Sequence, residues 1–220
     1  MRPCGRCGAT GRSERLAQYF AVHPTHPQPR LIRQAAKIVR DGGLIAYPTD
    51  SCYALGCHLG DATAQQRLRR VRGVDERHHL TLMCRDLSEI GTYAIVNTAQ
   101  FRLLKLATPG SYTFILRATR EVPRRLQHPR RKTIGVRVPS HAVALALLGE
   151  LGEPMLSATL MLPGAVQPLA DGPAIRAALE HELELIVDGG SCGTQPTTVI
   201  DLTGEAPLVL RQGKGALAAL

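Results

Sequence analysis

The sequence lacks the features that mark membrane-spanning, disordered or secreted chains. No window approaches the roughly 18 consecutive apolar residues that a membrane-spanning helix needs, and no tract has low complexity. With 44% apolar and 20% charged residues, the 220-residue chain is expected to fold as one globular domain. Four of its six cysteines are scattered through apolar or strand-like segments, and no secretory signal precedes them. We therefore expect reduced thiols in a cytoplasmic protein that does not contact membranes.

The common motifs of nucleotide and metal binding are also absent. The chain has no GxxxxGK[ST] loop, no GxGxxG turn and no Cys/His/Asp triad motif, so any use of ATP would not involve a P-loop. Cys4 and Cys7 form a lone C-x-x-C without further ligands at zinc-site spacing. We interpret residues 1–15 as a disordered N-terminal extension or an upstream start, and Glu14 argues against a transit peptide. The folded domain then covers residues 16–220.

What the chain does have is positive charge, carried almost entirely by arginine. The formal net charge is +9, and only four of the 27 basic residues are lysine. Arginine binds phosphate and carboxylate groups bidentately, and two clusters of it occupy residues 67–77 and 120–132. Each cluster has two interpretations: a solvated surface, or a surface that binds a nucleic acid or a nucleoside triphosphate. Charge alone does not separate them.

Apolar periodicity predicts a mixture of helices and strands. Helices are predicted over residues 29–41, 61–71, 98–107, 141–151 and 173–182, with Asp61 as an N-cap and Gly73 ending the second helix. Strands are predicted over residues 44–47, 80–84, 112–117, 133–138, 154–160, 183–187, 197–202 and 208–211. Because regular βαβ alternation fails near the C-terminus, we expect an α/β fold with a mixed, strongly twisted sheet and flanking helices.

Several of these strands carry hydroxyl or guanidinium groups on one side of otherwise apolar sequence. Alternation places Arg137 on the face opposite the apolar residues of its strand, and places Ser157 and Thr159 together on one face. Thr198 and Arg211 lie in the two last strands. Each residue alone would be an ordinary edge residue, but together they predict an anion pocket lined by strand ends.

Two pairs of residues, Arg70 with Arg72 and His78 with His79, could bind a ligand only if the local backbone brings their side chains together. Arg70 and Arg72 point apart on a helix but share a face on extended chain, and Gly73 indicates that the helix ends there, so their convergence stays open. His78 and His79 have the chemistry of metal ligands. Neighbours on a strand face opposite ways, however, and we predict no metal site.

The stretch "YPTDSCYALG", residues 47–56, raises the question of why a buried strand ends in hydroxyls and a carboxylate. It resembles the Y-P-T-[DE]-T-x-Y-G-L signature of the YrdC-like family, with Ser51 for the second Thr and Ala54 for Gly. The resemblance continues in the same order through "TPGSYTFIL", "IGVRVPSH", "GEPMLSATLMLPG", "QPTTVIDLT" and "VLRQG", and covers residues 19–215. Details such as "TLMCRDLSE" and "RKTIGVRVPS" are similar to the YciO branch.

The resemblance implies a single domain whose twisted, mostly parallel sheet curves around a large basic cavity. It also implies the activity of threonylcarbamoyl-adenylate synthases, which condense L-threonine, bicarbonate and ATP to threonylcarbamoyl-AMP and pyrophosphate for tRNA modification. ATP is then a substrate, and Mg²⁺ accompanies it without an identified protein site. Thr49, Ser51 and Tyr53 would line the threonine pocket, because the polar groups of threonine need partners once desolvated.

Position by position, the resemblance also implies a nucleotide site. The family's K-x-R motif falls on Arg70-Val71-Arg72, and its V-R-V-P arginine falls on Arg137. Catalysis would come from positioning and from neutralising the departing pyrophosphate. The implied catalytic residues are Arg70, Arg72 and Thr159, and the implied nucleotide-binding residues are Arg70, Arg72, Arg137, Ser157, Thr159, Thr198 and Arg211.

The chain departs from the family motifs at two positions. Arg70 replaces lysine, and Met161 replaces the asparagine of the S-x-N motif. A thioether cannot replace the hydrogen bonds of an amide, so we expect a weak synthase. Two alternatives stay open: a non-catalytic protein that binds tRNA, rRNA or double-stranded RNA through its arginine clusters, and carbamoyl-adenylate chemistry as in the related domain of hydrogenase-maturation proteins.

Overall fold

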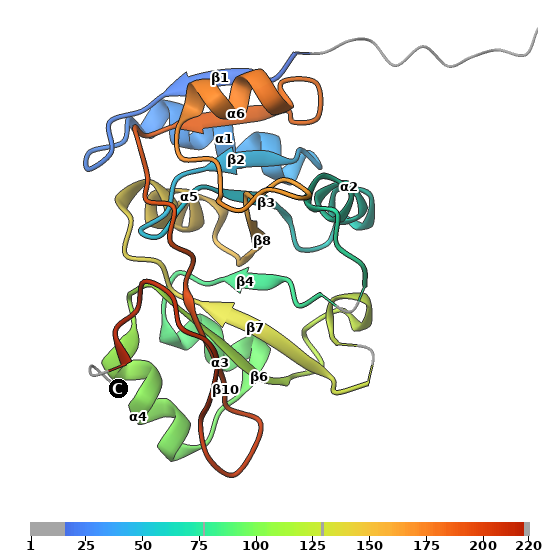
Figure 1. Cartoon of the computed structure of the whole chain (residues 1–220), viewed down its shortest axis with the longest axis vertical. Helices are drawn as coiled ribbons and strands as arrows, with labels where there is room; N and C mark the ends of the chain where they lie inside the picture. Colours follow the sequence, from blue (N-terminus) through green and yellow to red (C-terminus); the bar gives the residue numbers. More distant parts are fainter. Residues whose placement is uncertain (1–15, 77, 129, 218–220) are drawn as a thin grey trace, which may run out of the picture.

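The computed structural model describes residues 16–76, 78–128 and 130–217 (Figure 1). The proposed N-terminal extension and its Cys4–Cys7 pair lie outside the described residues. The strands are β1 (Gln18–Ala21), β2 (Ile45–Tyr47), β3 (Ala54–His58), β4 (Thr81–Met83), β5 (Ala94–Ile95), β6 (Tyr112–Ala118), β7 (Thr133–Arg137), β8 (Met155–Thr159), β9 (Leu185–Asp188), β10 (Thr198–Asp201) and β11 (Leu208–Arg211). The helices are α1 (Pro29–Arg40), α2 (Ala62–Arg72), α3 (Leu87–Tyr93), α4 (Thr98–Ala107), α5 (Ala142–Leu151) and α6 (Gly172–Leu179), with a short 3₁₀ turn η1 (Arg124–Leu126).

The described strands form one mixed sheet that runs the length of the molecule (Figure 1). Their order is β1-β9-β2-β3-β8-β4-β7-β6-β10-β11, with β5 paired to β6. Pairing is parallel for β1–β9, β2–β9, β4–β7 and β6–β10. It is antiparallel in the other described pairs, which are more numerous, because consecutive strands such as β2–β3 and β10–β11 pair directly without a crossover helix. The predicted mixed α/β fold is confirmed.

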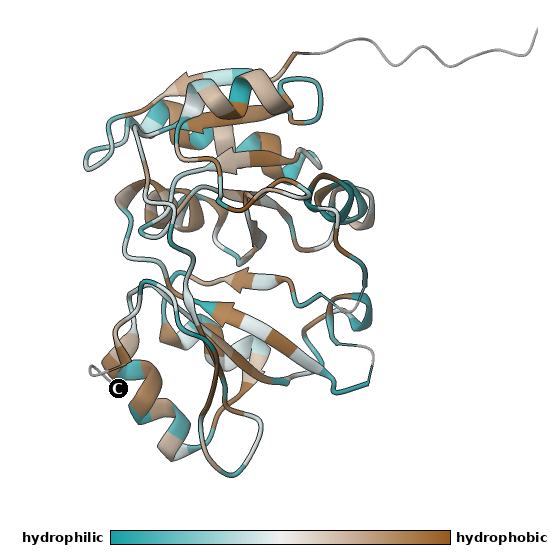
Figure 2. Ribbon diagram, in the orientation of Figure 1, coloured by the Kyte–Doolittle hydropathy of each residue, from teal (hydrophilic) through white to brown (hydrophobic). Residues whose placement is uncertain are grey.

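Helices cover both faces of the sheet, because successive residues of a strand point alternately into two apolar layers. Ile45 and Tyr47 of β2 pack with α1 and α5, whereas Ala46 between them belongs to the layer that contains α2 and α6. In Figure 2 the strands are largely hydrophobic, while α2, which carries several arginines, is largely hydrophilic. No described helix combines the length and the apolar character needed to cross a bilayer.

Local signals in the sequence explain where α2 begins and ends. Oδ1 of Asp61 accepts a hydrogen bond from the Ala64 amide at 2.8 Å, which caps the first turn. Gly73 ends the helix in the left-handed conformation, with φ of 63°. A Cβ at this glycine would also lie 2.7 Å from Cγ of Pro163. The helix therefore ends at Arg72, beside the segment that follows β8.

Candidate functional site

A cavity of about 300 Å³ lies against the middle of the sheet, and side chains from β3, β4, β6, β7, β8, β10 and β11 line it. Three arginines line it, and none of the lining residues among those described is acidic. An apolar cavity with a few convergent polar groups is typical of small-molecule sites. The polar lining consists mainly of the hydroxyls of Thr49, Ser51, Thr81, Thr113, Ser157, Thr159 and Thr197 and the guanidinium groups of Arg72, Arg137 and Arg211. This lining suits an anion.

The loop after β2 explains the hydroxyls at the end of a buried strand. Oγ1 of Thr49 donates a hydrogen bond to the carbonyl of Cys52 (2.6 Å) and accepts one from the amide of Ser51 (3.2 Å). The hydroxyl oxygens of Thr49 and Ser51 lie 3.1 Å apart, and both residues are buried against the cavity. The hydroxyls therefore shape the turn and bring oxygen atoms to the cavity wall.

Asp50, in the same loop, is not part of the cavity lining and instead orients Arg137. Nη2 of Arg137 donates to Oδ1 of Asp50 at 2.7 Å, and Asp50 also accepts hydrogen bonds from the Ser111 hydroxyl (2.6 Å) and the Ser140 amide (3.1 Å). Burial raises the pKa of Asp50, but the charge of Arg137 and the hydrogen bond from Ser111 outweigh it, so the pKa lies below its ordinary value. An ionised carboxylate thus fixes a buried cation. The Nε of Arg137 has no hydrogen-bond partner in the described part of the chain.

Arg72 and Arg211 supply the other two cations of the cavity. An Nη of Arg72 donates to the carbonyl of Met161, and its buried Nε has no partner among the residues described. Nε of Arg211 donates to the carbonyl of Thr197 at 3.1 Å. Burial lowers the pKa of both arginines, and the charge of Arg211 lowers that of Arg72 further. Guanidinium groups nevertheless stay charged in proteins, so an anion beside both would relieve their repulsion.

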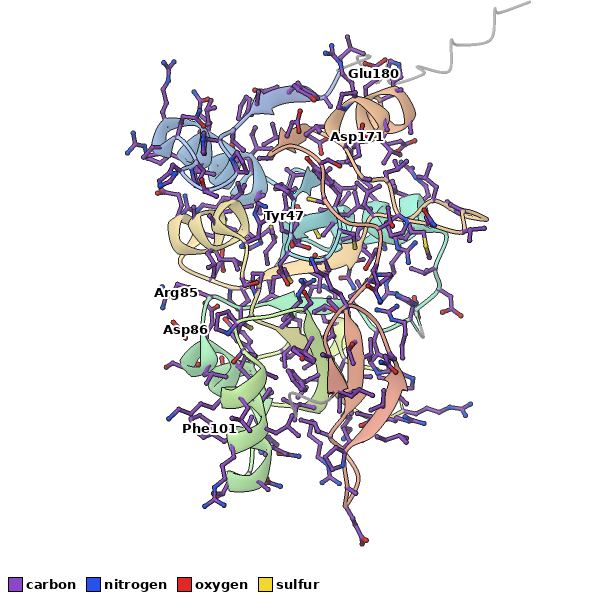
Figure 3. The ribbon with its side chains drawn as sticks, turned by 60° about the vertical axis from the view of Figure 1, so that its left-hand side comes forward. Tyr47, Arg85, Asp86, Phe101, Asp171 and Glu180 are labelled. Carbon is purple, nitrogen blue, oxygen red and sulfur yellow. The ribbon has the colours of Figure 1, made fainter. Side chains whose placement is uncertain are left out.

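β8 contributes two hydroxyls that differ in their freedom to bind a ligand. The Ser157 hydroxyl donates to the carbonyl of Leu55 at 2.9 Å and lies 2.8 Å from the hydroxyl of Tyr47, which is fully buried inside the molecule (Figure 3). A serine hydroxyl has one hydrogen, so Ser157 can offer a ligand only a lone pair. Thr159, at the end of the strand, is less buried and also lines the cavity.

The structure does not bring Arg70 to the cavity. Arg70 lies on α2 with 54% of its side chain exposed and pairs with Glu182 at 2.6 Å. Two residues further along the same helix, Arg72 points into the cavity, because positions i and i+2 of a helix do not share a face. Convergence of the two arginines, which the sequence left open, would require an extended segment, whereas α2 stays helical through Arg72.

Tyr53 and Thr198 also lie outside the cavity lining. The hydroxyl of Tyr53 donates to the carbonyl of Gly190 (2.8 Å), and its oxygen lies 3.1 Å from Oδ1 of Asp188, so it stabilises the segment that follows β9. The hydroxyl of Thr198 donates to the carbonyl of Gly215 at 2.6 Å. Thr197 takes the place expected for Thr198, because neighbouring residues alternate in direction.

Sequence reasoning missed several residues of the cavity. Thr113 lines it and lies 2.9 Å, oxygen to oxygen, from the hydroxyl of Thr197. The single threonine between Tyr112 and Phe114 in this largely apolar strand was a signal that could have found it. His78 and His79 both line the cavity although they are neighbours, because β4 begins only at Thr81 and the segment before it is not a strand. No cluster of three or more His, Cys, Asp or Glu residues within the described ranges could hold a metal ion.

Parts of the two arginine clusters are engaged in contacts within the protein. Arg67 pairs with Glu184 at 2.9 Å, and Arg125 donates to the carbonyl of Gly60 at 2.6 Å. Arg131 lies 3.6 Å from Asp201. These contacts favour the interpretation of the clusters as surface that stabilises the fold. Binding of RNA through them stays a prediction.

The fold and the cavity together define a class: an α/β protein with a buried, cationic and hydroxyl-lined site for a small anionic molecule. The sequence profile of the Sua5_yciO_yrdC family, described as "Telomere recombination", matches residues 37–213. The chain belongs to this family.

Three relatives show where the chain lies within the family. YciO of Escherichia coli K12 is 56% identical over 200 residues, which cover 91% of this chain and 97% of YciO. The crystal structure of E. coli YciO matches with a TM-score of 0.90 and covers 93% of this chain and 99% of that chain. The threonylcarbamoyl-AMP synthase of Chromobacterium violaceum is 36% identical over 189 residues, which cover 86% of this chain and 96% of the synthase. The Pyrococcus abyssi Sua5 structure complexed with L-threonine is 28% identical, with a TM-score of 0.82 over 89% of this chain and 57% of that chain. The resemblance predicted from the motifs is confirmed, including the similarity to YciO.

Proposed function

We propose that this protein is a nucleotidyltransferase of the threonylcarbamoyl-AMP synthase type, with ATP, L-threonine and bicarbonate as substrates. The observation that carries the proposal is the cavity lining. Three arginines line it without an acidic neighbour in the lining, and the buried Nε atoms of Arg72 and Arg137 lack partners among the described residues. The relative named threonylcarbamoyl-AMP synthase and the Sua5 complex with L-threonine support the choice of substrates.

The proposed reaction makes two bonds and releases two small molecules. The amino nitrogen of threonine bonds to the carbon of bicarbonate with loss of water, and an oxygen of the resulting carbamate then displaces pyrophosphate from the α-phosphorus of ATP. Arg72, Arg137 and Arg211 would neutralise the triphosphate and the departing pyrophosphate, where added positive charge stabilises the transition state. Thr49 and Ser51 would hold the amino acid, and Thr159 would donate a hydrogen bond to the nucleotide. Mg²⁺ would arrive with ATP.

Met161 is the reason to expect a slow enzyme. Its side chain lines the cavity and its carbonyl accepts a hydrogen bond from Arg72, so this position contacts the anion site. The family motif places an amide here, and a thioether is at best a weak acceptor. Losing a hydrogen bond to a charged group costs about 1.5–3 kcal/mol, which corresponds to roughly ten- to a hundredfold in rate if the bond acts in the transition state.

The test is pyrophosphate release from ATP with bicarbonate and Mg²⁺, measured with and without L-threonine. We expect release that requires L-threonine, with threonylcarbamoyl-AMP identified by mass spectrometry, and less release with L-valine, which has the same shape without the hydroxyl. Met161→Asn should raise the rate about tenfold, whereas Met161→Leu should leave it unchanged. Release that is independent of the amino acid, or no release above background, would refute the proposal.

A further inference from the structure

His78 and His79 line the same cavity as the arginines, yet the proposed reaction assigns them no role. They lie between α2 and β4, beside Arg72. Nε2 of His79 lies 3.1 Å from Oγ1 of Thr133, and its ring stacks on the ring of His128 with centroids 4.8 Å apart and an interplanar angle of 21°. The amide of His78 donates to the carbonyl of Asp75 at 3.3 Å. Contacts from the loop after α2, from β7 and from the loop before β7 therefore hold this pair at the cavity wall.

The surroundings favour the neutral form of both imidazoles in the free protein. Burial is the main cause that lowers the pKa of His78, followed by the charges of Arg72 and Arg69. Burial also comes first for His79, whose pKa is lowered further by His128. The charged and titratable groups that face the pair are Arg69, Arg72, Asp75, His128, Arg131, Asp201 and Arg211, and the two carboxylates among them act in the opposite direction.

We propose that His78 and His79 are a proton-linked part of the anion site: they become positively charged when a phosphate-bearing ligand enters the cavity and add their charge to that of Arg72 and Arg211. The inference rests on the proposed function in taking that ligand to be the triphosphate of ATP or the pyrophosphate released from it. L-Threonine is a poorer candidate, because its single carboxylate is accompanied by an ammonium group.

The direction of the effect follows from linkage between protons and ligand. A multiply charged anion stabilises the imidazolium form, so the pKa of each histidine is higher in the complex than in the free protein. Binding then takes up protons, and affinity increases as the pH falls through the pKa of the complex. We expect the affinity for MgATP to rise about tenfold between pH 8 and pH 6, since a pKa difference of one unit corresponds to a factor of ten.

Two measurements test the inference. In the first, the imidazole resonances of the whole protein are titrated by NMR without ligand, with MgATP and with Mg-pyrophosphate, and the pKa values of His78 and His79 are expected to rise with ligand. His181, of which 64% of the side chain is exposed, serves as the unaffected control. In the second, MgATP affinity is measured by calorimetry at pH 6 and pH 8 for the wild type, for His78→Gln with His79→Gln, and for His181→Gln. The double variant should lose most of the pH dependence, and the His181→Gln variant should keep it.

The possible outcomes separate this inference from the proposed function. Saturable ATP binding without any change in the titration of His78 and His79 overturns the inference and leaves the proposed function standing. Binding of pyrophosphate with the expected shifts, but no binding of ATP, supports the inference and removes the proposed function. If neither anion binds, both are overturned. The wild-type titration decides the question even if the double variant does not fold, and melting temperatures of the variants show whether they do.

Discussion

The residues Asp50 and Arg137 form an ion pair in which the two members have different tasks. Their side chains are 11% and 7% exposed, and the carboxylate is held by Ser111 and Ser140 as well. The carboxylate therefore orients the guanidinium group, and the guanidinium group lines the cavity. Breaking a buried pair by removing one charge is strongly destabilising, because it leaves the other charge without compensation.

Because of this ion pair, we expect the wild type and an Asp50→Asn variant to differ in stability by an amount that depends on pH. Asp50→Asn should lower the free energy of unfolding at pH 7 by roughly 3 kcal/mol. The folded-state pKa of Asp50 is lowered, so its contribution is present above the unfolded pKa of about 3.9 and is lost as the pH falls through the folded pKa. Urea denaturation of wild type and variant should therefore give curves that differ at pH 7 and converge in acid. A difference that stays constant down to pH 3 would contradict this account of the pair.

Much of the chemistry of single residues could be predicted from the sequence, but their placement could not. Thr49, Ser51, Arg72 and Arg137 were predicted for the site, and the structure places all four in the cavity lining. Tyr53 was predicted for the site as well, but it lies outside the cavity lining. The sequence could not show this, because the hydrogen bond from its hydroxyl to the carbonyl of Gly190 joins residues that are 137 apart in the sequence. Such a contact leaves no local periodicity to detect.

At the scale of the element, β10 shows how strand alternation divides two neighbouring threonines between two functions. The segment before it brings Thr197 to the cavity, where Arg211 contacts it, while Thr198 contacts Gly213 and Gly215 and fixes the C-terminal segment. A shift of one residue in this strand would exchange the two roles.

The two threonines give a matched pair of variants. Thr197→Val should weaken ATP binding by about tenfold, the cost of one hydrogen bond in the site. It should change stability less than Thr198→Val, because the Thr113 hydroxyl that loses a partner lines the cavity. Thr198→Val should lower the free energy of unfolding by about 1–3 kcal/mol, because it leaves buried backbone groups unsatisfied, with little change in ATP affinity. Calorimetry and thermal denaturation of both variants check this. Equal effects of the two variants on ATP affinity would contradict the description in which Thr197 faces the cavity and Thr198 faces away from it.

Other elements could be predicted to different degrees. α1, α2, α4 and α5 were predicted close to their observed bounds because caps, glycines and an apolar stripe mark them. α3 and β1 were not predicted. α3 is only seven residues long, and β1 acquires its identity by pairing with β9 at the far end of the chain. Short elements that depend on tertiary pairing carry little signal of their own.

At the scale of the whole molecule, the proposed function depends on where positive charge is gathered. The chain carries a net charge of +9, but the proposed function requires only the arginines that line the cavity. Sequence alone could not make that division, because exposed and buried arginines occur in the same cluster, as Arg70 and Arg72 do. Binding of RNA to the exposed part would weaken steeply with salt, whereas a site with buried charges is screened less.

The same two arginines give the most direct test of the central claim, that the cavity and not the charged surface binds ATP. The measurement is MgATP affinity by calorimetry for the wild type, Arg72→Ala and Arg70→Ala, with a melting temperature for each. The account predicts at least a tenfold loss of affinity for Arg72→Ala, as expected when a charged hydrogen-bond donor is removed. It predicts a change of less than about twofold for Arg70→Ala, since loss of an exposed charge contributes little. Equal losses for both variants, or a larger loss for Arg70→Ala, would contradict it.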